Sequence, residues 1–140
     1  MKEMIYKPLE GYEILHSEKK GDYNIVIVSY GTHPCAYVSI PSTHPYYQEY
    51  YFDMPIDCNG GLTFSEPNNS NVRWGEKFPN EECSWIGWDY SHCNDFNGAF
   101  IGKESPYLEY SLLHKWTTQE ILDECYSVIA QLNLLKLVKI

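Results

Sequence analysis

The sequence predicts an α+β fold in which an antiparallel sheet of about four to six strands carries one long C-terminal helix on one face. Short segments rich in β-branched and aromatic residues alternate with glycine and proline turns, and a single long helical period comes last. At 140 residues, 44% of them hydrophobic, the chain is expected to form one domain, residues 1–140. It contains no apolar run of the roughly 18 residues that a membrane span needs, so no membrane partner is expected.

Three strands are expected in the first third of the chain. Residues 12–16 and 23–30 flank a glycine-containing turn, which indicates an antiparallel hairpin. Residues 35–40 form a third expected strand, bracketed by Pro34 and Pro41, because proline cannot donate a hydrogen bond to a sheet. A three-stranded meander is the simplest arrangement of these segments.

The middle of the chain is expected to hold two more strands and two loops. Residues 41–57 are too aromatic for a solvated loop and too rich in proline for a long helix, so we expect a covering loop. Residues 60–64 begin a strand after a glycine turn, and residues 84–90 form another. The polar, turn-rich segment 66–82 should be exposed and mobile, and residues 94–107 should form a loop.

The one long helix signal lies near the end of the chain. Thr117 as N-cap and Glu120 three residues later form a capping box. Apolar residues then follow at helical spacing: Ile121, Leu122, Cys125, Val128, Ile129 and Leu132. This helix should pack on one face of the sheet, and the last seven residues extend it or add an edge strand.

The charge of the chain restricts its partners. A formal net charge of -9, with one arginine and nine lysines, opposes direct binding to nucleic acid. A chain of this charge is suited to bind a basic protein surface. It could also hold a small ligand in a pocket whose local groups outweigh the net negative charge. Acidity that only keeps the domain soluble is the third alternative.

The five cysteines and the N-terminus indicate a cytoplasmic protein. The cysteines are odd in number and include no C-x-x-C pair, so we expect free thiols in a reducing compartment, with Cys125 in the core. Acidic residues interrupt the N-terminal segment, which therefore does not look like a secretion signal.

Two histidines precede prolines at the two ends of the expected third strand. His33 and His44 would therefore lie in strand-end loops, where binding groups gather. The alternative is that both cap backbone carbonyls. Asp57 and Asn59 precede the turn Gly60-Gly61, where missing side chains would let a ligand approach the backbone.

The segment WIGWDYSHCND, residues 85–95, contains the densest group of chemical functions. If residues 85–90 are extended, Ile86, Trp88 and Tyr90 face the core, and Trp85 and Asp89 face the opposite surface. The following turn should bring His92 and Asp95 near Asp89.

A divalent metal is one use for this group. Asp89, His92 and Asp95, joined by Asp57 or His33, offer suitable ligands, but their spacing fits no zinc signature. We expect no metal and no other cofactor. A Cys93 nucleophile is also not expected, because no residue is arranged to activate its thiol.

Three motifs, HPCAYVSIPSTHPYY, DCNGGLTF and WIGWDYSHCND, resemble an uncharacterised family of small proteins carried by bacteriophages and prophages. In that family a GYV-P-GHP-Y segment precedes HGGLT, WW-GFD-AH-GD follows, and a helix with LE-V and A-QL comes last. The resemblance covers residues 33–95 and 118–132. It implies that the recurring motif positions are His44, Gly60, Gly61, Leu62, Thr63, Trp85, Gly87, Asp89, His92 and Asp95.

The resemblance also implies a biological setting. Small accessory phage proteins of this kind often disarm host defence, which would place this chain in the cytoplasm of a host cell. Asn59 stands where the family pattern has histidine, so a mechanism that needs an imidazole there would be lost. This departure favours binding over hydrolysis.

Three hypotheses of function follow. The first is a counter-defence protein that sequesters a nucleotide-derived ligand, with tyrosine or tryptophan rings (Trp88 among them) on the base. Phosphates would then need Arg73, Lys77 and Lys103, or a second subunit of a homo-oligomer. The second is an acidic inhibitor of a nucleic-acid-binding defence protein, and the third is a small metal-dependent hydrolase. The expected ligand-binding residues are His44, Tyr46, Tyr47, Asp57, Asn59, Gly60, Gly61, Arg73, Trp85, Asp89, His92 and Asp95.

Overall fold

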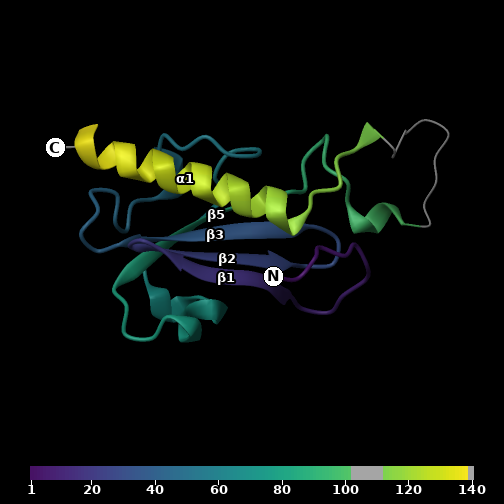
Figure 1. The fold of residues 1–140 in the computed structure, drawn as a ribbon, viewed down its shortest axis with the longest axis horizontal. Coiled ribbons are helices and arrows are strands. Elements are labelled where there is room, and N and C mark those ends of the chain that lie inside the picture. Colours follow the sequence, from purple (N-terminus) through teal and green to yellow (C-terminus); the bar gives the residue numbers. More distant parts are fainter. Residues whose placement is uncertain (102–111, 139–140) are drawn as a thin grey trace.

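The computed structural model describes residues 1–101 and 112–138, and its strands form one antiparallel sheet (Figure 1). The order across the sheet is β1-β2-β3-β5-β4. This arrangement, with one C-terminal helix, confirms the predicted α+β class. The strands are β1 (Glu13–Lys20), β2 (Tyr23–Ser29), β3 (Pro34–Pro41), β4 (Phe64–Glu66) and β5 (Cys83–Asp89).

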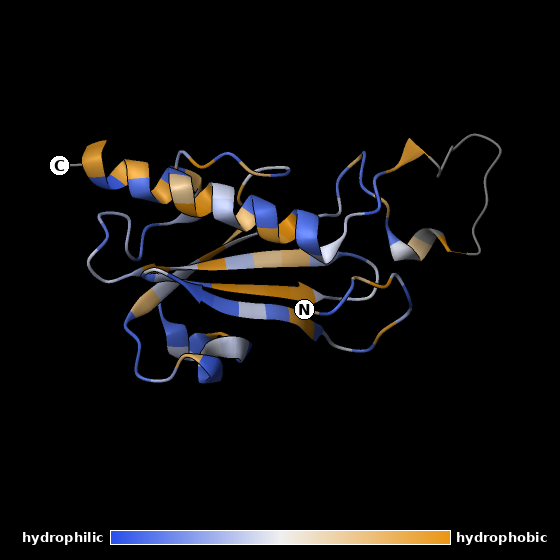
Figure 2. Cartoon of the chain, viewed as in Figure 1, coloured by the Kyte–Doolittle hydropathy of each residue, from blue (hydrophilic) through white to orange (hydrophobic). Residues whose placement is uncertain are grey.

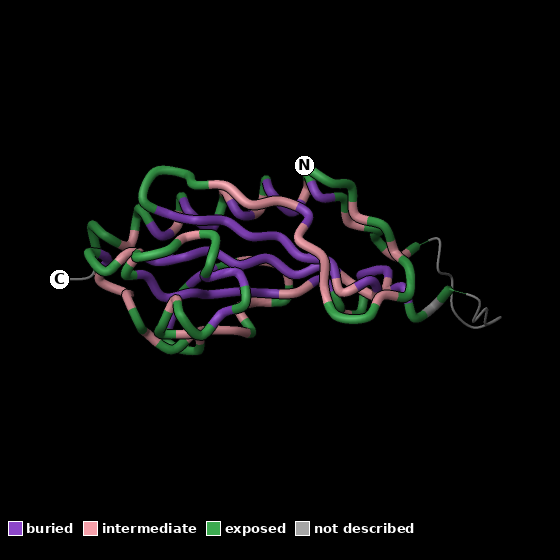
Figure 3. Tube along the Cα trace, turned by 90° about the horizontal axis from the view of Figure 1, so that it is seen from below, coloured by how far each residue is buried: buried purple, intermediate pink, exposed green. Residues whose placement is uncertain are grey.

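The predicted meander forms the first three strands of the sheet. β1 pairs with β2 and β2 with β3, each antiparallel. The free side of β3 pairs with β5 in a register that sets Cys35 opposite Asp89 and Pro41 opposite Cys83. β2, β3 and β5 are buried along almost their whole length (Figure 3), whereas most residues of β1 and all residues of β4 are only half-buried or exposed. β3 therefore lies at the centre of the sheet, and its two ends are far apart.

Helix α1 (Thr118–Val138) covers one face of the sheet (Figure 1). The predicted capping box is present: Glu120 N donates to Thr117 Oγ1 at 3.2 Å, and Thr117 N donates to Glu120 Oε1 at 3.0 Å. The predicted apolar residues of α1 are buried and share one core with Ile86, Trp88 and Tyr90. The segment 134–138, whose state the sequence left open, continues the helix.

A second, smaller core covers the other face of the sheet. Trp74 packs its ring 5.7 Å from that of Trp85, and Val72 is buried beside it. These two residues come from the segment that contains the short 3-10 helices η2 (Asn69–Asn71) and η3 (Arg73–Lys77). The prediction that residues 66–82 are exposed is therefore wrong for part of this segment, because the aromatic face of β5 needs a cover of its own.

The segment between β3 and β4 packs on the helix side, as the prediction of a covering loop requires. It contains the 3-10 helix η1 (Tyr51–Asp53), and Met54 and Ile56 join the core under α1. The 3-10 helix η4 (Gly98–Phe100) lies in the predicted loop 94–107, and Lys103 falls outside the described residues. Among the described helices, none has the length and apolar character of a membrane span.

Candidate functional site

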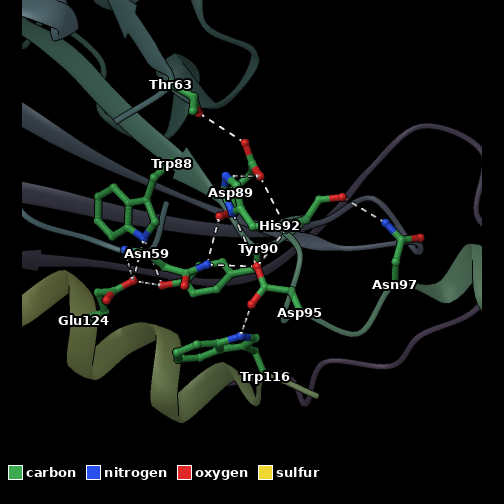
Figure 4. A network of polar contacts seen from close by, with 11 residues as sticks. Asn59, Thr63, Trp88, Asp89, Tyr90, His92, Asp95, Asn97, Trp116 and Glu124 are labelled. Carbon is green, nitrogen blue, oxygen red and sulfur yellow. Dashed lines mark hydrogen bonds and ion pairs between the residues drawn. The ribbon is translucent and has the colours of Figure 1, made fainter. Parts of the chain in front are cut away.

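A network of polar side chains connects the end of β5 to two distant segments (Figure 4). Asp89 ends β5, and the turn after it carries His92 and Asp95. The loop before β4 contributes Asn59, and the segment before α1 contributes Trp116. The prediction that the turn brings His92 and Asp95 near Asp89 is confirmed by ion-pair distances of 3.6 Å and 3.4 Å from His92 to the two carboxylates.

Asp95 is the buried centre of this network, with 5% of its surface exposed. Its Oδ1 accepts a hydrogen bond of 2.7 Å from Nε1 of Trp116. Its Oδ2 accepts bonds of 3.0 Å from Nδ2 of Asn59 and from the backbone N–H of His92. A buried carboxylate needs such donors, and here they come from three separate segments. Asp95 therefore holds the loop, the turn and the start of the helix together.

The imidazole of His92 lies over the glycine turn. A Cβ at position 60 would stand 2.2 Å from Cε1 of His92, so any side chain here would force the imidazole to move. Gly60 also has a φ of 72°, which favours glycine on its own account. Nδ1 of His92 is buried without a hydrogen-bond partner, 3.4 Å from Oδ2 of Asp95. The sequence assigned the space at Gly60 to a ligand, but the structure fills it with His92.

Asp89 and His33 lie at the more open side of the same sheet end. Asp89 accepts hydrogen bonds from Thr63 Oγ1 at 3.2 Å and from the backbone N–H of Ser91 at 3.1 Å. Burial lowers the pKa of His33, Asp89 opposes this shift, and His92 adds to it. The carbonyl of Pro34, the next residue, accepts a hydrogen bond of 3.1 Å from the backbone N–H of Tyr90, so the backbone brings His33 to the end of the sheet where Asp89 lies.

Sequence reasoning missed a second acceptor beside this network. Oε1 of Glu124 accepts from Tyr90 Oη at 2.5 Å, from Trp88 Nε1 at 3.1 Å and from the backbone N–H of Asn59 at 3.2 Å. Burial and the Glu124 carboxylate raise the pKa of Tyr90. The signal was present in the sequence, because Glu124 lies three residues after Ile121 and therefore falls on the apolar stripe of the helix.

His44 lies at the other end of β3, and it is a structural residue. It is 3% exposed, and its Nε2 lies 2.8 Å from the carbonyl of Leu132 in α1. Nδ1 accepts from the backbone N–H of Tyr46 at 3.0 Å. A carbonyl only accepts, so Nε2 carries the proton and the ring is neutral. The prediction of a ligand-facing His44 is wrong, and the alternative of a histidine bonded to a backbone carbonyl is confirmed.

The loop that contains Tyr46 and Tyr47 lies away from Asp89 and His92. Tyr46 and Tyr47 pack against the core under α1, next to His44. Asp89 lies opposite Cys35, at the far end of β3. The expected ligand-binding residues therefore do not gather in one place, because Tyr46 and Tyr47 lie at the opposite end of β3 from Asp89.

Two tryptophans predicted as stacking residues are core residues instead. Trp85 is 0% exposed, its Nε1 donates to Asn69 Oδ1 at 2.9 Å, and Phe78 packs 5.8 Å from its ring. Trp88 is buried on the helix side, as its core prediction required. Neither ring offers a face to a base. Asp57 is exposed, but its backbone N–H and carbonyl bond to the side chain of Gln131 in α1 at 2.7 Å and 2.8 Å.

A surface hollow of about 730 Å³ lies away from the network, on the segment that covers the second core. Of the predicted ligand residues, Arg73 and Tyr47 line this hollow. The guanidinium carbon of Arg73 lies 5.4 Å from the ring centre of Tyr12. The carboxylates of the lining belong to Glu76, Glu81 and Glu82, and they oppose a phosphate in this place.

The described residues contain no group of three or more His, Cys, Asp or Glu side chains that could hold a metal ion. Asp89, His92 and Asp95, which the sequence offered as metal ligands, do not form such a group. The cysteines are free, as expected, and Cys125 is fully buried in the core. Cys93 is exposed in the turn after β5.

The fold and the network define an α+β sheet-and-helix protein whose densest polar cluster fastens loops to the helix. Compared with family models, curated proteins and solved structures, the chain shows no match. The resemblance to phage accessory proteins stays a prediction, and many of the motif positions that suggested it build the network and the two cores.

Proposed function

We propose that this chain is a binding protein whose acidic surface covers a basic surface of a partner protein, of the kind that nucleic-acid-binding proteins present. The observation that carries this proposal is the charge distribution. Residues 21–72 contain no lysine or arginine but five carboxylates, from Asp22, Glu49, Asp53, Asp57 and Glu66. Of these, Asp22, Asp53 and Asp57 are exposed. The exposed carboxylates of this segment would attract an oppositely charged partner and speed its association.

The burial of several motif residues supports this proposal. His44, Trp85 and Asp95, which a ligand pocket would need at its surface, are buried and bonded inside the protein. These residues therefore stabilise the fold. We attribute binding to the exposed acidic residues instead. The phage resemblance would make the partner a host defence protein.

Sequestration of a nucleotide-derived ligand stays a prediction with less geometric support. The hollow that contains Arg73 also carries glutamates, and the tyrosines of residues 46–47 lie far from Asp89. A metal-dependent hydrolase has less support still, because the described residues form no metal-binding group.

Binding to a short lysine-only peptide tests the proposal. We expect binding that weakens steeply as salt is raised, and no comparable binding to duplex DNA. The variant Asp53→Lys/Asp57→Lys should lose affinity for the peptide. Glu3→Lys/Glu10→Lys, which changes the net charge equally at exposed sites outside residues 21–72, is the matched control and should lose less. Equal losses, or salt-sensitive binding to DNA, would contradict the proposal.

A further inference from the structure

Two aromatic side chains are exposed to solvent within residues 21–72, the segment that contains no lysine or arginine. Phe52 is 81% exposed and Tyr50 is 58% exposed. Single exposed apolar residues are common, but here two large exposed rings lie only two positions apart, Tyr50 directly before the short 3-10 helix η1 and Phe52 within it. We call Tyr50 and Phe52 the aromatic patch.

The backbone that carries the aromatic patch is held from both sides. Gln48, just before it, has a φ of 64°, which a residue with a side chain adopts at a cost. Its N–H donates to Ser84 Oγ at 3.0 Å, and its Nε2 donates to the carbonyl of Pro67 at 3.2 Å. The N–H of Tyr51 donates to Ser65 Oγ at 3.1 Å, and Met54 is buried in the core. The rings are therefore presented on a fixed support, which lowers the entropy lost on binding.

The charges around the aromatic patch indicate what it meets. Asp53 follows Phe52 directly, and the nearest lysine or arginine in the sequence is Arg73 on one side and Lys20 on the other. Aromatic rings next to an exposed carboxylate complement an apolar pocket bordered by lysine or arginine. A partner surface rich in carboxylates would instead be repelled by Asp53.

The end of helix α1 provides a contrast within the same protein. The last turns of α1 include strongly hydrophobic segments in Figure 2, and Leu134 and Leu137 in these turns are exposed. Their charged neighbour is Lys136, which a basic partner would repel. The neighbouring charge therefore distinguishes these two exposed apolar places and favours the aromatic patch as the contact for a basic partner.

We propose that Tyr50 and Phe52 are the apolar anchor of the interface, inserting into an apolar pocket bordered by lysine and arginine on the basic partner protein. This inference rests on the proposed function. Aromatic anchors at the centre of an interface commonly carry most of its affinity. The surrounding carboxylates then steer the partner and fix its orientation.

Two peptides of equal charge test the anchor: one of lysines alone, and one in which leucines are interspersed between the lysines. The leucine-containing peptide should bind more tightly to the unaltered protein. In Tyr50→Ser/Phe52→Ser this advantage should fall by about tenfold, while the lysine-only peptide binds as before. Because both rings are exposed, the variant should keep the melting temperature of the parent.

The matched control is Leu134→Ser/Leu137→Ser, which removes exposed apolar surface at the end of α1. It should leave the preference for the leucine-containing peptide intact. If both peptides bind but the Tyr50/Phe52 variant keeps the preference, the anchor is wrong and the proposed function stands. If neither peptide binds in a salt-sensitive way, the proposed function itself fails. Self-association of the protein that the Tyr50/Phe52 variant abolishes would assign the patch to a second copy and overturn the anchor.

Discussion

The imidazole of His92 occupies the position that a side chain on Gly60 would need, because a Cβ there would lie within 2.3 Å of its Nε2. Gly61, the next residue, has a similar φ of 82° but open space around its own Cβ position. The two glycines therefore have different roles. Gly61 supplies backbone conformation alone, whereas Gly60 supplies conformation and the contact surface for His92.

Replacing Gly60 with alanine should destabilise the protein by about 2 to 4 kcal/mol, because left-handed backbone strain adds to the clash with the imidazole. Gly61→Ala should cost only about 1 kcal/mol, the strain alone. Chemical denaturation of the two variants measures the difference.

The double variant Gly60→Ala/His92→Ala tests whether the excess loss of stability in Gly60→Ala comes from the clash with the imidazole. It should recover most of the excess loss of Gly60→Ala over Gly61→Ala, because the ring that meets the new methyl group is gone. Equal destabilisation by the two single glycine variants would mean that the His92 contact has no energetic weight.

Much of the fold was predictable because its signals are local. The capping box at Thr117 and the apolar spacing of the helix depend on neighbours in the sequence, and so does the alternation that placed Trp88 in the core. The alternation rule failed at Trp85. It assumes a sheet with one solvated face, but β5 is buried on both faces by α1 and by Trp74. Nothing local marks Trp74 as a cover, since it lies in a polar segment.

The candidate site divides in the same way. Asp89, His92 and Asp95 meet because one turn joins them, so their proximity followed from the sequence. Their partners Asn59 and Trp116 lie 36 and 21 positions from Asp95, and pairing over such separations depends on tertiary structure. Whether the turn bounds an open pocket or fastens the fold depends on these distant contacts, which local patterns do not contain.

The stability of the protein should fall at alkaline pH. Burial, with Asp89 adding to it, raises the pKa of Cys35 to about 12. Burial and then Glu124 raise the pKa of Cys58 to about 12. Thiols in an unfolded chain ionise near pH 8.5. Between about pH 8.5 and 12 the folded state therefore binds more protons than the unfolded state, and the free energy of unfolding falls as pH rises.

Melting temperatures measured from pH 7 to about pH 11 check this prediction. The parent should be nearly constant up to about pH 8 and then decline. Cys58→Ala should decline less steeply, whereas Cys93→Ala, which alters an exposed thiol in a turn, should follow the parent. A melting temperature that stays flat to the end of this range would contradict the argument.

Asp95 should be the costliest carboxylate of the network to neutralise. Asp95→Asn replaces one of two accepting oxygens with an amino group, so Trp116 Nε1, or Asn59 and the His92 N–H, lose their acceptor inside the protein. We expect a loss of about 2 to 4 kcal/mol in the free energy of unfolding, since several buried donors depend on the charged group. Urea denaturation measures this loss.

Asp89→Asn is the matched control for that change, because Asp89 is more exposed and its donors, Thr63 Oγ1 and the Ser91 N–H, are near solvent. It should cost about 1 kcal/mol or less. The indole N–H resonance of Trp116 gives a local readout: it should shift strongly in Asp95→Asn and little in Asp89→Asn, because only Asp95 accepts that hydrogen bond. If the two variants lose equal stability and leave this resonance in place, Asp95 does not fasten the loop to the helix. The turn after β5 would then again be a candidate ligand-binding site.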